Sequence, residues 1–427
     1  MERNDPRYQA YVEILKEELI PAMGCTEPIA LAYAAAKARE VLGVLPDSVQ
    51  LQVSGSIIKN VKSVIVPNTG HLKGMEAAVA AGIIAGSAEK ELEVISEVSE
   101  EKKSAIRDYL QTVPITIEHT EQGHVFDIVV TERCGQDYAR VRIADYHTNI
   151  CRIERNGTVL YEVPLLDETV QEDARADRSL LNMQDIWDFA ETADLRDVAD
   201  LLERQIRYNN AIAEEGLLGD YGANIGRVLL TTYGNDVSNR AKAKAAAGSD
   251  ARMNGCELPV IINSGSGNQG ITTSVPVIVY ARELGVSDEK LLRALTLSNL
   301  TTIHEKTPIG RLSAYCGAIS AGAGAGAGIA YLCGGDYDAV IHTVVNALAV
   351  VSGVICDGAK ASCAAKIATA VEAGLLGYNM YIRGNQFRAG DGIVAKGVEN
   401  SLKNVGRLGK QGMKETNNEI IAIMVGC

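Results

Sequence analysis

Nine cysteines are spread over the 427 residues of the chain, and three of them are spaced so that their side chains could meet. Cys356 and Cys363 are separated by a turn-forming Asp-Gly pair, and Cys316 lies forty residues earlier at the head of a glycine-rich segment. A helical hairpin, down through Gly328 and back through Val350, would bring Cys316 close to Cys356. Three thiolates that meet without a fourth ligand suit an iron–sulfur cluster with one open iron.

Two other interpretations of these cysteines stay open on spacing alone. Structural zinc usually takes paired C-x2–4-C knuckles, which this sequence lacks. Free cysteine is also an ordinary small core residue. We adopt the core interpretation for four of the remaining cysteines, Cys134, Cys151, Cys256 and Cys333.

The elements that must position the cysteines fall into two groups. Alternating, β-branched stretches predict strands around a Ser54-Gly55-Ser56 turn and at 114–118, 125–131, 139–144, 151–155 and 158–163. Beyond them, Ala, Gly, Leu and Val recur with helical periodicity at 183–215, 236–248, 274–285, 288–303, 312–333, 338–354 and 361–376. We therefore predict an α/β (α+β) domain over 1–175 and a mainly α-helical domain over 176–427.

Charge and hydropathy exclude several classes of protein. The chain carries 41 Lys and Arg against 54 Asp and Glu, and this acidic balance argues against nucleic acid as a partner. Unpaired cysteines and the lack of a visible signal peptide favour the cytoplasm. Residues 312–335 and 339–356 are uncharged, but the first is built of small residues and the second holds His342 and Asn346. Close-packed helices are therefore favoured over a membrane hairpin.

Five motifs occur in order along the chain. They are Gly24-Cys25-Thr26-Glu27-Pro28, Ser54-Gly55-Ser56-Ile57-Ile58-Lys59-Asn60, Ser264-Gly265-Ser266-Gly267-Asn268-Gln269-Gly270, Gly310-Arg311-Leu312-Ser313-Ala314-Tyr315-Cys316-Gly317 and Cys356-Asp357-Gly358-Ala359-Lys360. Together they resemble the motifs of the L-cysteine desulfidase family, which is related to the alpha chain of iron–sulfur L-serine dehydratases. The resemblance runs from about residue 10 to about residue 425.

The resemblance implies a PLP-independent lyase that uses a [4Fe–4S] cluster to convert L-cysteine to pyruvate, ammonia and hydrogen sulfide. In the family pattern the cluster ligands fall on Cys316, Cys356 and Cys363, and Cys25 is the proton acceptor. The step from Cys356 to Asp357 continues into Gly-Ala-Lys rather than Pro, a departure from the dehydratase form that favours the desulfidase. L-serine dehydratase and a non-catalytic cluster- or metal-binding protein remain the alternatives.

Removing a thiol from an amino acid requires a base for the Cα proton and help for the departing sulfide. A thiolate whose pKa is lowered by a helix N-terminus qualifies, and Cys25 lies just ahead of Pro28, a residue suited to a first helical turn. We expect Glu27 to hold the substrate ammonium. The carboxylate is expected on two similar loops, which share a loop type or are alike by chance, through Ser54, Ser56, Asn60, Ser264, Ser266 and Asn268.

The expected partner is a small-molecule amino acid, L-cysteine or L-serine. Neither nucleic acid nor a membrane is expected, and a homodimer is compatible with the sequence. Cys427 carries the same thiol and carboxylate as the substrate, so the tail could occupy the open iron, with a frayed terminus as the alternative.

Overall fold

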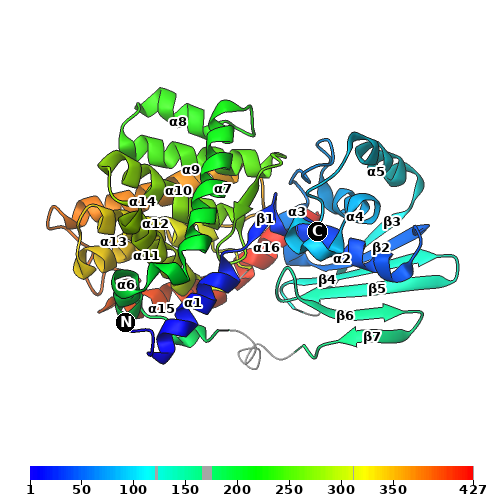
Figure 1. The fold of residues 1–427 in the computed structure, drawn as a ribbon, viewed down its shortest axis with the longest axis horizontal. Helices are drawn as coiled ribbons and strands as arrows, with labels where there is room; N and C mark the ends of the chain where they lie inside the picture. The colour runs from blue at the N-terminus through cyan, green and yellow to red at the C-terminus, as the bar shows by residue number, and fades with distance from the viewer. Residues whose placement is uncertain (121–123, 166–175, 311, 427) are drawn as a thin grey trace.

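The computed structural model describes residues 1–120, 124–165, 176–310 and 312–426, which form two parts (Figure 1). The N-terminal part combines a six-stranded sheet with helices, and the following part is mainly helical. The predicted fold class is confirmed. The predicted boundary at residue 175 lies outside the described residues and stays a prediction.

The sheet has the strand order β3-β2-β4-β5-β6-β7, in which β2 and β3 are parallel and the other neighbours antiparallel. The strand region expected from alternating residues is therefore present. Asn156 and Gly157, both at positive φ, form the turn between the last two strands. The strands are β2 (Ser48–Ser54), β3 (Ile115–Thr120), β4 (Asp127–Cys134), β5 (Asp137–Ala144), β6 (Ile150–Arg155) and β7 (Thr158–Glu162).

Helices α2 (Thr26–Leu42), α3 (Gly55–Val61), α4 (Gly74–Ala85) and α5 (Glu100–Thr112) complete the N-terminal part, and α2 packs against β4 and β5. The expected turn between two strands at Ser54 is wrong, because β2 ends there and α3 begins. All seven residues of α3 are buried. A short segment that is buried on every side, polar residues included, shows no hydrophobic periodicity, so the sequence pattern could not separate a helix from a strand.

The helical part is arranged around α12, which packs against α10, α11, α13 and α14 (Figure 1). The helix expected over 183–215 is two helices, because a short 3-10 turn capped by Asp194 interrupts it. None of the helices in the described ranges is long and apolar enough to cross a bilayer. The helices are α6 (Met183–Thr192), α7 (Ala199–Leu218), α8 (Ile225–Tyr233), α9 (Val237–Met253), α10 (Gly267–Leu284), α11 (Asp288–Lys306), α12 (Gly317–Leu332), α13 (Tyr337–Val351), α14 (Ser362–Tyr381) and α15 (Val398–Arg407).

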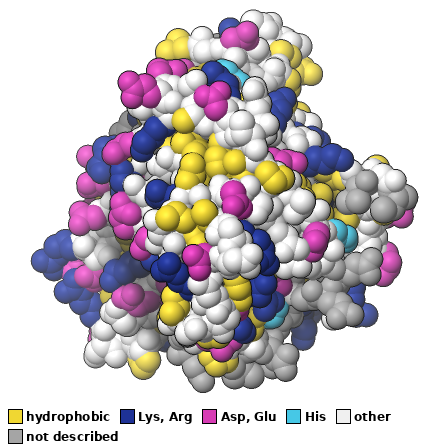
Figure 2. Space-filling view, turned by 90° about the vertical axis from the view of Figure 1, so that its right-hand side faces the viewer, with side chains coloured by type: hydrophobic (Ala, Val, Ile, Leu, Met, Phe, Trp, Pro, Cys, Tyr) yellow, Lys and Arg dark blue, Asp and Glu magenta, His cyan; other side chains and the backbone are white. Residues whose placement is uncertain are grey.

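The two parts are joined by elements that cross between them. Helix α1 (Pro6–Glu18) packs its tyrosine rings on Phe189 of α6, and β1 (Pro21–Met23) pairs with β8 (Pro259–Ile261). At the other end, α16 (Lys414–Val425) returns to lie against α3 (Figure 1). Acidic and basic side chains are intermixed on the face that the N-terminal part presents in Figure 2.

Small residues allow α12 and α14 to approach closely. A Cβ added at Gly374 would lie 2.4 Å from the carbonyl oxygen of Gly322 and 3.2 Å from the Cα of Gly326. Such contacts are far below normal van der Waals distances, so the glycines are required by packing rather than by backbone conformation.

We predict that Gly374→Ala lowers the melting temperature, because the added methyl group overpacks this contact at a cost of about 1–3 kcal/mol. Thermal unfolding followed by circular dichroism measures the change. Gly353→Ala is the matched control, since a Cβ there would meet nothing within 4 Å. Equal melting temperatures for the two variants would contradict the packing argument.

Candidate active site

The three cysteines predicted as ligands lie on segments that the structure brings together. Tyr315 pairs with Ile355 in an antiparallel bridge. Consistent with this, the Cys316 N–H donates to the Val354 carbonyl at 3.2 Å, and the Cys356 N–H donates to the Ala314 carbonyl at 2.6 Å. The hairpin of α12 and α13 expected from the sequence is what closes this contact. Cys363 follows in the first turn of α14, where its thiol lies 3.6 Å from the Gly358 carbonyl oxygen.

The three thiols influence one another electrostatically. Burial and the neighbouring Cys356 raise the pKa of the Cys316 thiol to about 12, and the same two causes raise the pKa of Cys363. Grouped thiolates repel one another, and a bound cationic metal relieves that repulsion. Three cysteine thiolates are the type of ligand that an iron–sulfur cluster takes. Within the described ranges, no three His, Cys, Asp or Glu side chains are arranged to hold a metal ion.

The loop between Cys356 and Cys363 is shaped by Asp357. Its carboxylate forms ion pairs with Lys360 and Lys366, and the Lys366 ammonium also donates to the Ile355 carbonyl at 2.9 Å. Burial opposes ionisation of Asp357, but the hydrogen bonds from the two lysines lower its pKa to about 2. The loop is therefore held by local charge pairs.

Gly358 lets this loop touch the N-terminal part. It has φ +97°, and a Cβ there would lie 2.1 Å from the Lys59 carbonyl oxygen of α3. The Lys59 side chain is 2% exposed, and its ammonium donates to Asn417 Oδ1 of α16 at 2.7 Å and to the Cys356 carbonyl at 3.3 Å. Burial lowers the pKa of Lys59 while nearby acidic groups oppose this. Lys59 thus links α3, α16 and the loop between Cys356 and Cys363, which we call the cysteine loop.

Cys25, Glu27 and Asn60 form one buried group at the start of α2. The Cys25 thiol donates to Glu27 Oε2 at 3.0 Å, and Asn60 Nδ2 donates to Glu27 Oε1 at 3.0 Å. His147 Nε2 lies 3.8 Å from the same oxygen, which is an electrostatic contact and too long for a hydrogen bond. The motif residues expected to act together are therefore neighbours, and His147 joins them.

The pKa of the Cys25 thiol is shifted in the direction opposite to the one expected. Burial raises it well above its ordinary value, and the Glu27 carboxylate raises it further. The predicted lowering by the helix N-terminus is wrong, because desolvation and an adjacent negative charge outweigh the helix dipole. For Glu27, burial alone would raise the pKa, but contacts with His147 and Cys25 lower it to about 2. The substrate-free site holds a thiol beside a carboxylate.

The two Ser-Gly-Ser loops both lead into a helix but differ in conformation. Ser264 and Gly265 have positive φ and form a tight turn, in which the Ser264 hydroxyl donates to Asn263 Oδ1 at 2.8 Å. Thr26 donates to the Gly265 carbonyl at 3.0 Å, which brings this turn to Cys25. Ser54 instead donates to the Val125 carbonyl at 2.8 Å. The remaining predicted residues lie in the first turns of the helices or just before them, Ser56 in α3 and Ser266 and Asn268 at α10.

Arg252, at the end of α9, is a site residue that sequence patterns did not indicate. It is 2% exposed, and its Nε and Nη2 atoms are buried with no hydrogen-bond partner. Its charge interacts with Cys25, Glu27 and Cys363. Sequence patterns held no distinct signal for it, because α9 also carries Arg240, Lys242 and Lys244, and a cation in the last turn of a helix is common. Three side-chain oxygens share this lack of a partner in the surrounding segments, those of Asn60, Asn268 and Gln269.

Other predictions have mixed outcomes. Of the four cysteines assigned to the core, Cys151 and Cys256 are buried, Cys134 is half-buried and Cys333 is exposed, so the assignment is wrong for the last. Cys333 follows the final turn of α12, where the helix reaches the surface. Cys427, expected to reach the iron, lies outside the described residues, as does Arg311 of the fourth motif.

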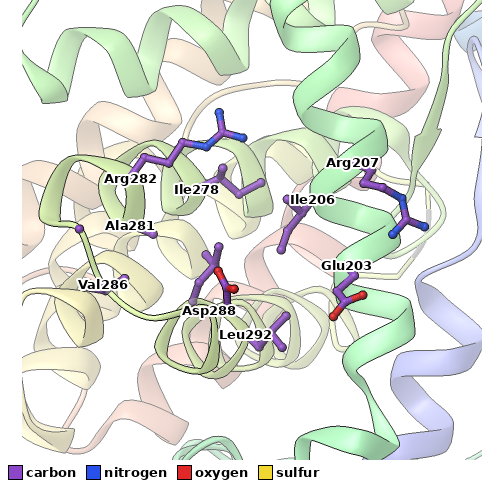
Figure 3. A pocket seen from close by; sticks show the side chains of 11 residues that line it. Glu203, Ile206, Arg207, Ile278, Ala281, Arg282, Val286, Asp288 and Leu292 are labelled. Atoms are coloured by element: carbon purple, nitrogen blue, oxygen red, sulfur yellow. The ribbon is translucent and has the colours of Figure 1, made fainter.

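A cavity of about 420 Å³ lies between α7, α10 and α11 (Figure 3). Ile278 and Leu292 line it, with Glu203 and Arg282 among its charged residues. Its lining holds no cysteine and no buried polar atom without a partner. We therefore place the candidate active site at the cysteines and not in this cavity.

Residues 89–422 match the family model described as the serine dehydratase alpha chain. The chain therefore belongs to the serine dehydratase alpha chain family, and the predicted relationship is confirmed. Membership supports a lyase of the serine dehydratase type, in a family with iron–sulfur dependence.

Curated relatives cover nearly the whole chain. A UPF0597 protein of Desulfitobacterium hafniense is 61% identical over 100% of this chain and 98% of its own length. UPF0597 proteins of Lachnoclostridium phytofermentans and Treponema denticola are 51% and 45% identical, over 98% and 100% of this chain and 100% of their own lengths. The chain thus matches its relatives from end to end.

We predict that Asn60→Asp destabilises the protein at pH 8, because it replaces a donor to Glu27 with a second buried carboxylate. Loss of a hydrogen bond to a charged group costs about 1.5–3 kcal/mol. Repulsion raises the folded-state pKa of the introduced carboxyl above its unfolded value of about 3.9. The destabilisation is therefore complete above the folded-state pKa and fades as the pH falls through it.

Melting temperatures measured between pH 8 and pH 5 test this prediction. Asn404→Asp is the control, since the Asn404 amide also donates a hydrogen bond, but it lies exposed and its acceptor is the Ile393 carbonyl rather than a carboxylate. If the melting temperature of Asn60→Asp lies below that of the unchanged protein by the same amount at every pH, no carboxylate pair forms.

Proposed function

We propose that this protein is an L-cysteine desulfidase, a PLP-independent iron–sulfur lyase that converts L-cysteine to pyruvate, ammonia and hydrogen sulfide. The observation that carries the proposal is the meeting of two groups from different parts of the chain. Cys25 packs with Met253 of α9, and the partly buried Cys363 lies against the same cluster. A candidate base therefore lies beside a candidate cluster ligand.

Cys316, Cys356 and Cys363 would hold the cluster, which we propose is [4Fe–4S] with one iron free of protein ligands. When bound, such an iron supplies Lewis acidity toward the substrate. The buried Lys59 fixes the backbone of the cysteine loop, and Asp357 with its two lysines fixes the segment that follows.

The proposed proton path runs through Cys25 and Glu27. Glu27 takes the Cys25 proton across their 3.0 Å hydrogen bond, and the resulting thiolate removes the Cα proton of the substrate. The Cβ–S bond breaks with its electrons on sulfur, and Glu27 returns its proton to give hydrogen sulfide. The remaining aminoacrylate reacts with one water to give pyruvate and ammonium.

The first proton transfer is unfavourable in the substrate-free site, because the pKa of Cys25 is raised and that of Glu27 is lowered. A positive charge near Cys25 favours its thiolate. The substrate ammonium supplies such a charge when it lies nearer to Cys25 than to Glu27, so in this proposal the base forms after the amino acid has bound. This order protects the thiol from reaction between turnovers.

L-serine dehydratase is the second candidate, and the description of the matching family model favours it. Both reactions need the same base and differ in the group that leaves Cβ. A thiol leaves more readily than a hydroxyl, and a pocket shaped for sulfur need not favour oxygen.

We predict a higher kcat/KM for L-cysteine than for L-serine with anaerobically reconstituted protein and no added PLP. Pyruvate formation is measured for both amino acids, and sulfide release for L-cysteine. A preference for L-serine would make the protein a dehydratase, and turnover of neither would leave the non-catalytic cluster-binding alternative.

We also predict that serine at Cys316, Cys356 or Cys363 lowers bound iron and visible absorbance after anaerobic reconstitution, because hydroxyl is a poor cluster ligand. Cys333→Ser is the control, since that thiol is exposed at the far end of α12. Iron content is measured together with activity.

Cys25→Ala separates the base from the ligands in the same experiment. It should keep the iron of the unchanged protein but lose about 10²- to 10⁴-fold in kcat, the usual contribution of a general base. Loss of iron in Cys25→Ala, or full iron in all three ligand variants, would contradict the proposed roles.

A further inference from the structure

Arg252 is a buried cation, and two of the three nitrogens of its guanidinium group are buried without a hydrogen-bond partner. An arginine at 2% exposure normally pairs its guanidinium with a carboxylate or with carbonyl groups. Here Nε and Nη2 are buried and have no partner. Leaving a buried charged donor without an acceptor costs several kcal/mol, so such a group is kept where a ligand completes it.

A second positive group lies directly beside Arg252. The first residue of α10 is Gly267, where a Cβ would come within 2.3 Å of Arg252 Nε and 2.7 Å of Cζ. Ser266 precedes the helix and makes no side-chain capping bond. The guanidinium therefore packs against an uncapped helix N-terminus, which also carries partial positive charge. Two positive groups in contact favour a site for an anion.

The nearby Glu27 does not complete this site. Its two oxygens already accept hydrogen bonds from Cys25 and Asn60. It interacts with Arg252 through charge, and no hydrogen bond between them satisfies the guanidinium. Among the residues that the structure describes, no carboxylate hydrogen-bonds to the Arg252 guanidinium, so the site is left for the anion of a ligand.

We propose that Arg252, together with the first turn of α10, binds the α-carboxylate of the amino acid substrate. The inference rests on the proposed function for the presence of an amino acid, but not on whether Cβ carries sulfur or oxygen. A guanidinium offers two parallel N–H groups to a carboxylate, which fixes the orientation of the substrate as well as its position. Met253, the next residue after Arg252, packs in one buried cluster with Cys25, and Cys363 lies against that cluster. A carboxylate bound at Arg252 would therefore place Cα near these two thiols.

This assignment changes the expected role of the serine loops. The Ser54 hydroxyl donates to Val125 and the Ser264 hydroxyl to Asn263, so neither proton is free for a carboxylate. The unpartnered Asn60 oxygen can instead accept from the ammonium, because the Asn60 amide nitrogen is held by Glu27. Carboxylate and ammonium thus have separate partners.

The experiment measures ligand binding by anaerobic calorimetry on the reconstituted protein, with probes that cannot complete the reaction. 3-Mercaptopropionate and 3-hydroxypropionate keep the carboxylate and lack the amine, whereas cysteamine keeps the amine and thiol and lacks the carboxylate. The variant is Arg252→Gln. The control is Arg204→Gln, a change in another arginine with a buried, unpartnered Nε, whose Nη2 donates to the Leu19 carbonyl at 3.4 Å.

We expect Arg252→Gln to lower the affinity for the carboxylate probe by at least about 30-fold relative to the unchanged protein. This is the usual effect of truncating one partner of a buried charge pair. Cysteamine should bind equally to all three proteins. The melting temperature without ligand should stay the same or rise, because the variant removes an unpaired buried charge. Arg204→Gln should leave the affinity for the carboxylate probe unchanged.

The inference is overturned if Arg252→Gln binds both carboxylate probes as tightly as the unchanged protein does. It is also overturned if the variant loses as much affinity for cysteamine as for the carboxylate probe. It is likewise overturned if the unchanged protein binds neither carboxylate, or if Arg252→Gln unfolds at a lower temperature and loses all three probes. Loss of 3-hydroxypropionate binding in Arg252→Gln, in a protein that releases no sulfide from L-cysteine, supports the inference while refuting the desulfidase.

Discussion

The burial of three charged side chains at the junction of the two parts is the constraint on which the site depends. Glu27, Lys59 and Arg252 are each at most 8% exposed. Removing a charge from water costs several kcal/mol unless neighbours replace the lost hydrogen bonds. Glu27 and Lys59 obtain those hydrogen bonds from protein groups, whereas the Arg252 Nε and Nη2 atoms have no partner. The arrangement of nearby elements follows from this requirement.

Each satisfied charge draws on segments far apart in the sequence. Lys59 of α3 is held by the carbonyl of Cys356 and by Asn417 of α16, and Thr26 beside Glu27 binds the Gly265 turn. The positive φ of Gly358 allows the cysteine loop to come close enough for the first of these contacts. The buried charges and the close backbone approach therefore support one another, and neither part of the chain forms the site alone.

Sequence patterns predicted well what depends on local periodicity. The α+β and helical parts, the strands after residue 113 and the meeting of Cys316 with Cys356 all follow from hydrophobic spacing and a helical hairpin. Sequence patterns failed where the outcome depends on tertiary contact. The helix at Gly55, the raised pKa of Cys25 and the buried Arg252 depend on burial by distant segments, which no single stretch of sequence encodes.

Each terminal helix packs on elements that are distant from it in the sequence, and this affects the order in which contacts can form during synthesis. Helix α1 packs with the helical part, and α16 packs on α3 of the N-terminal part. At about 5–20 residues per second, α3 leaves the ribosome tens of seconds before α16. Helix α1 likewise waits for partners that begin at residue 178. The sheet can form early, but the surface around Lys59 stays open to water until residue 414 and its successors arrive. The contacts that bury the Lys59 ammonium are thus completed only after α16 has been made, although the loop and helix that they join were made before it.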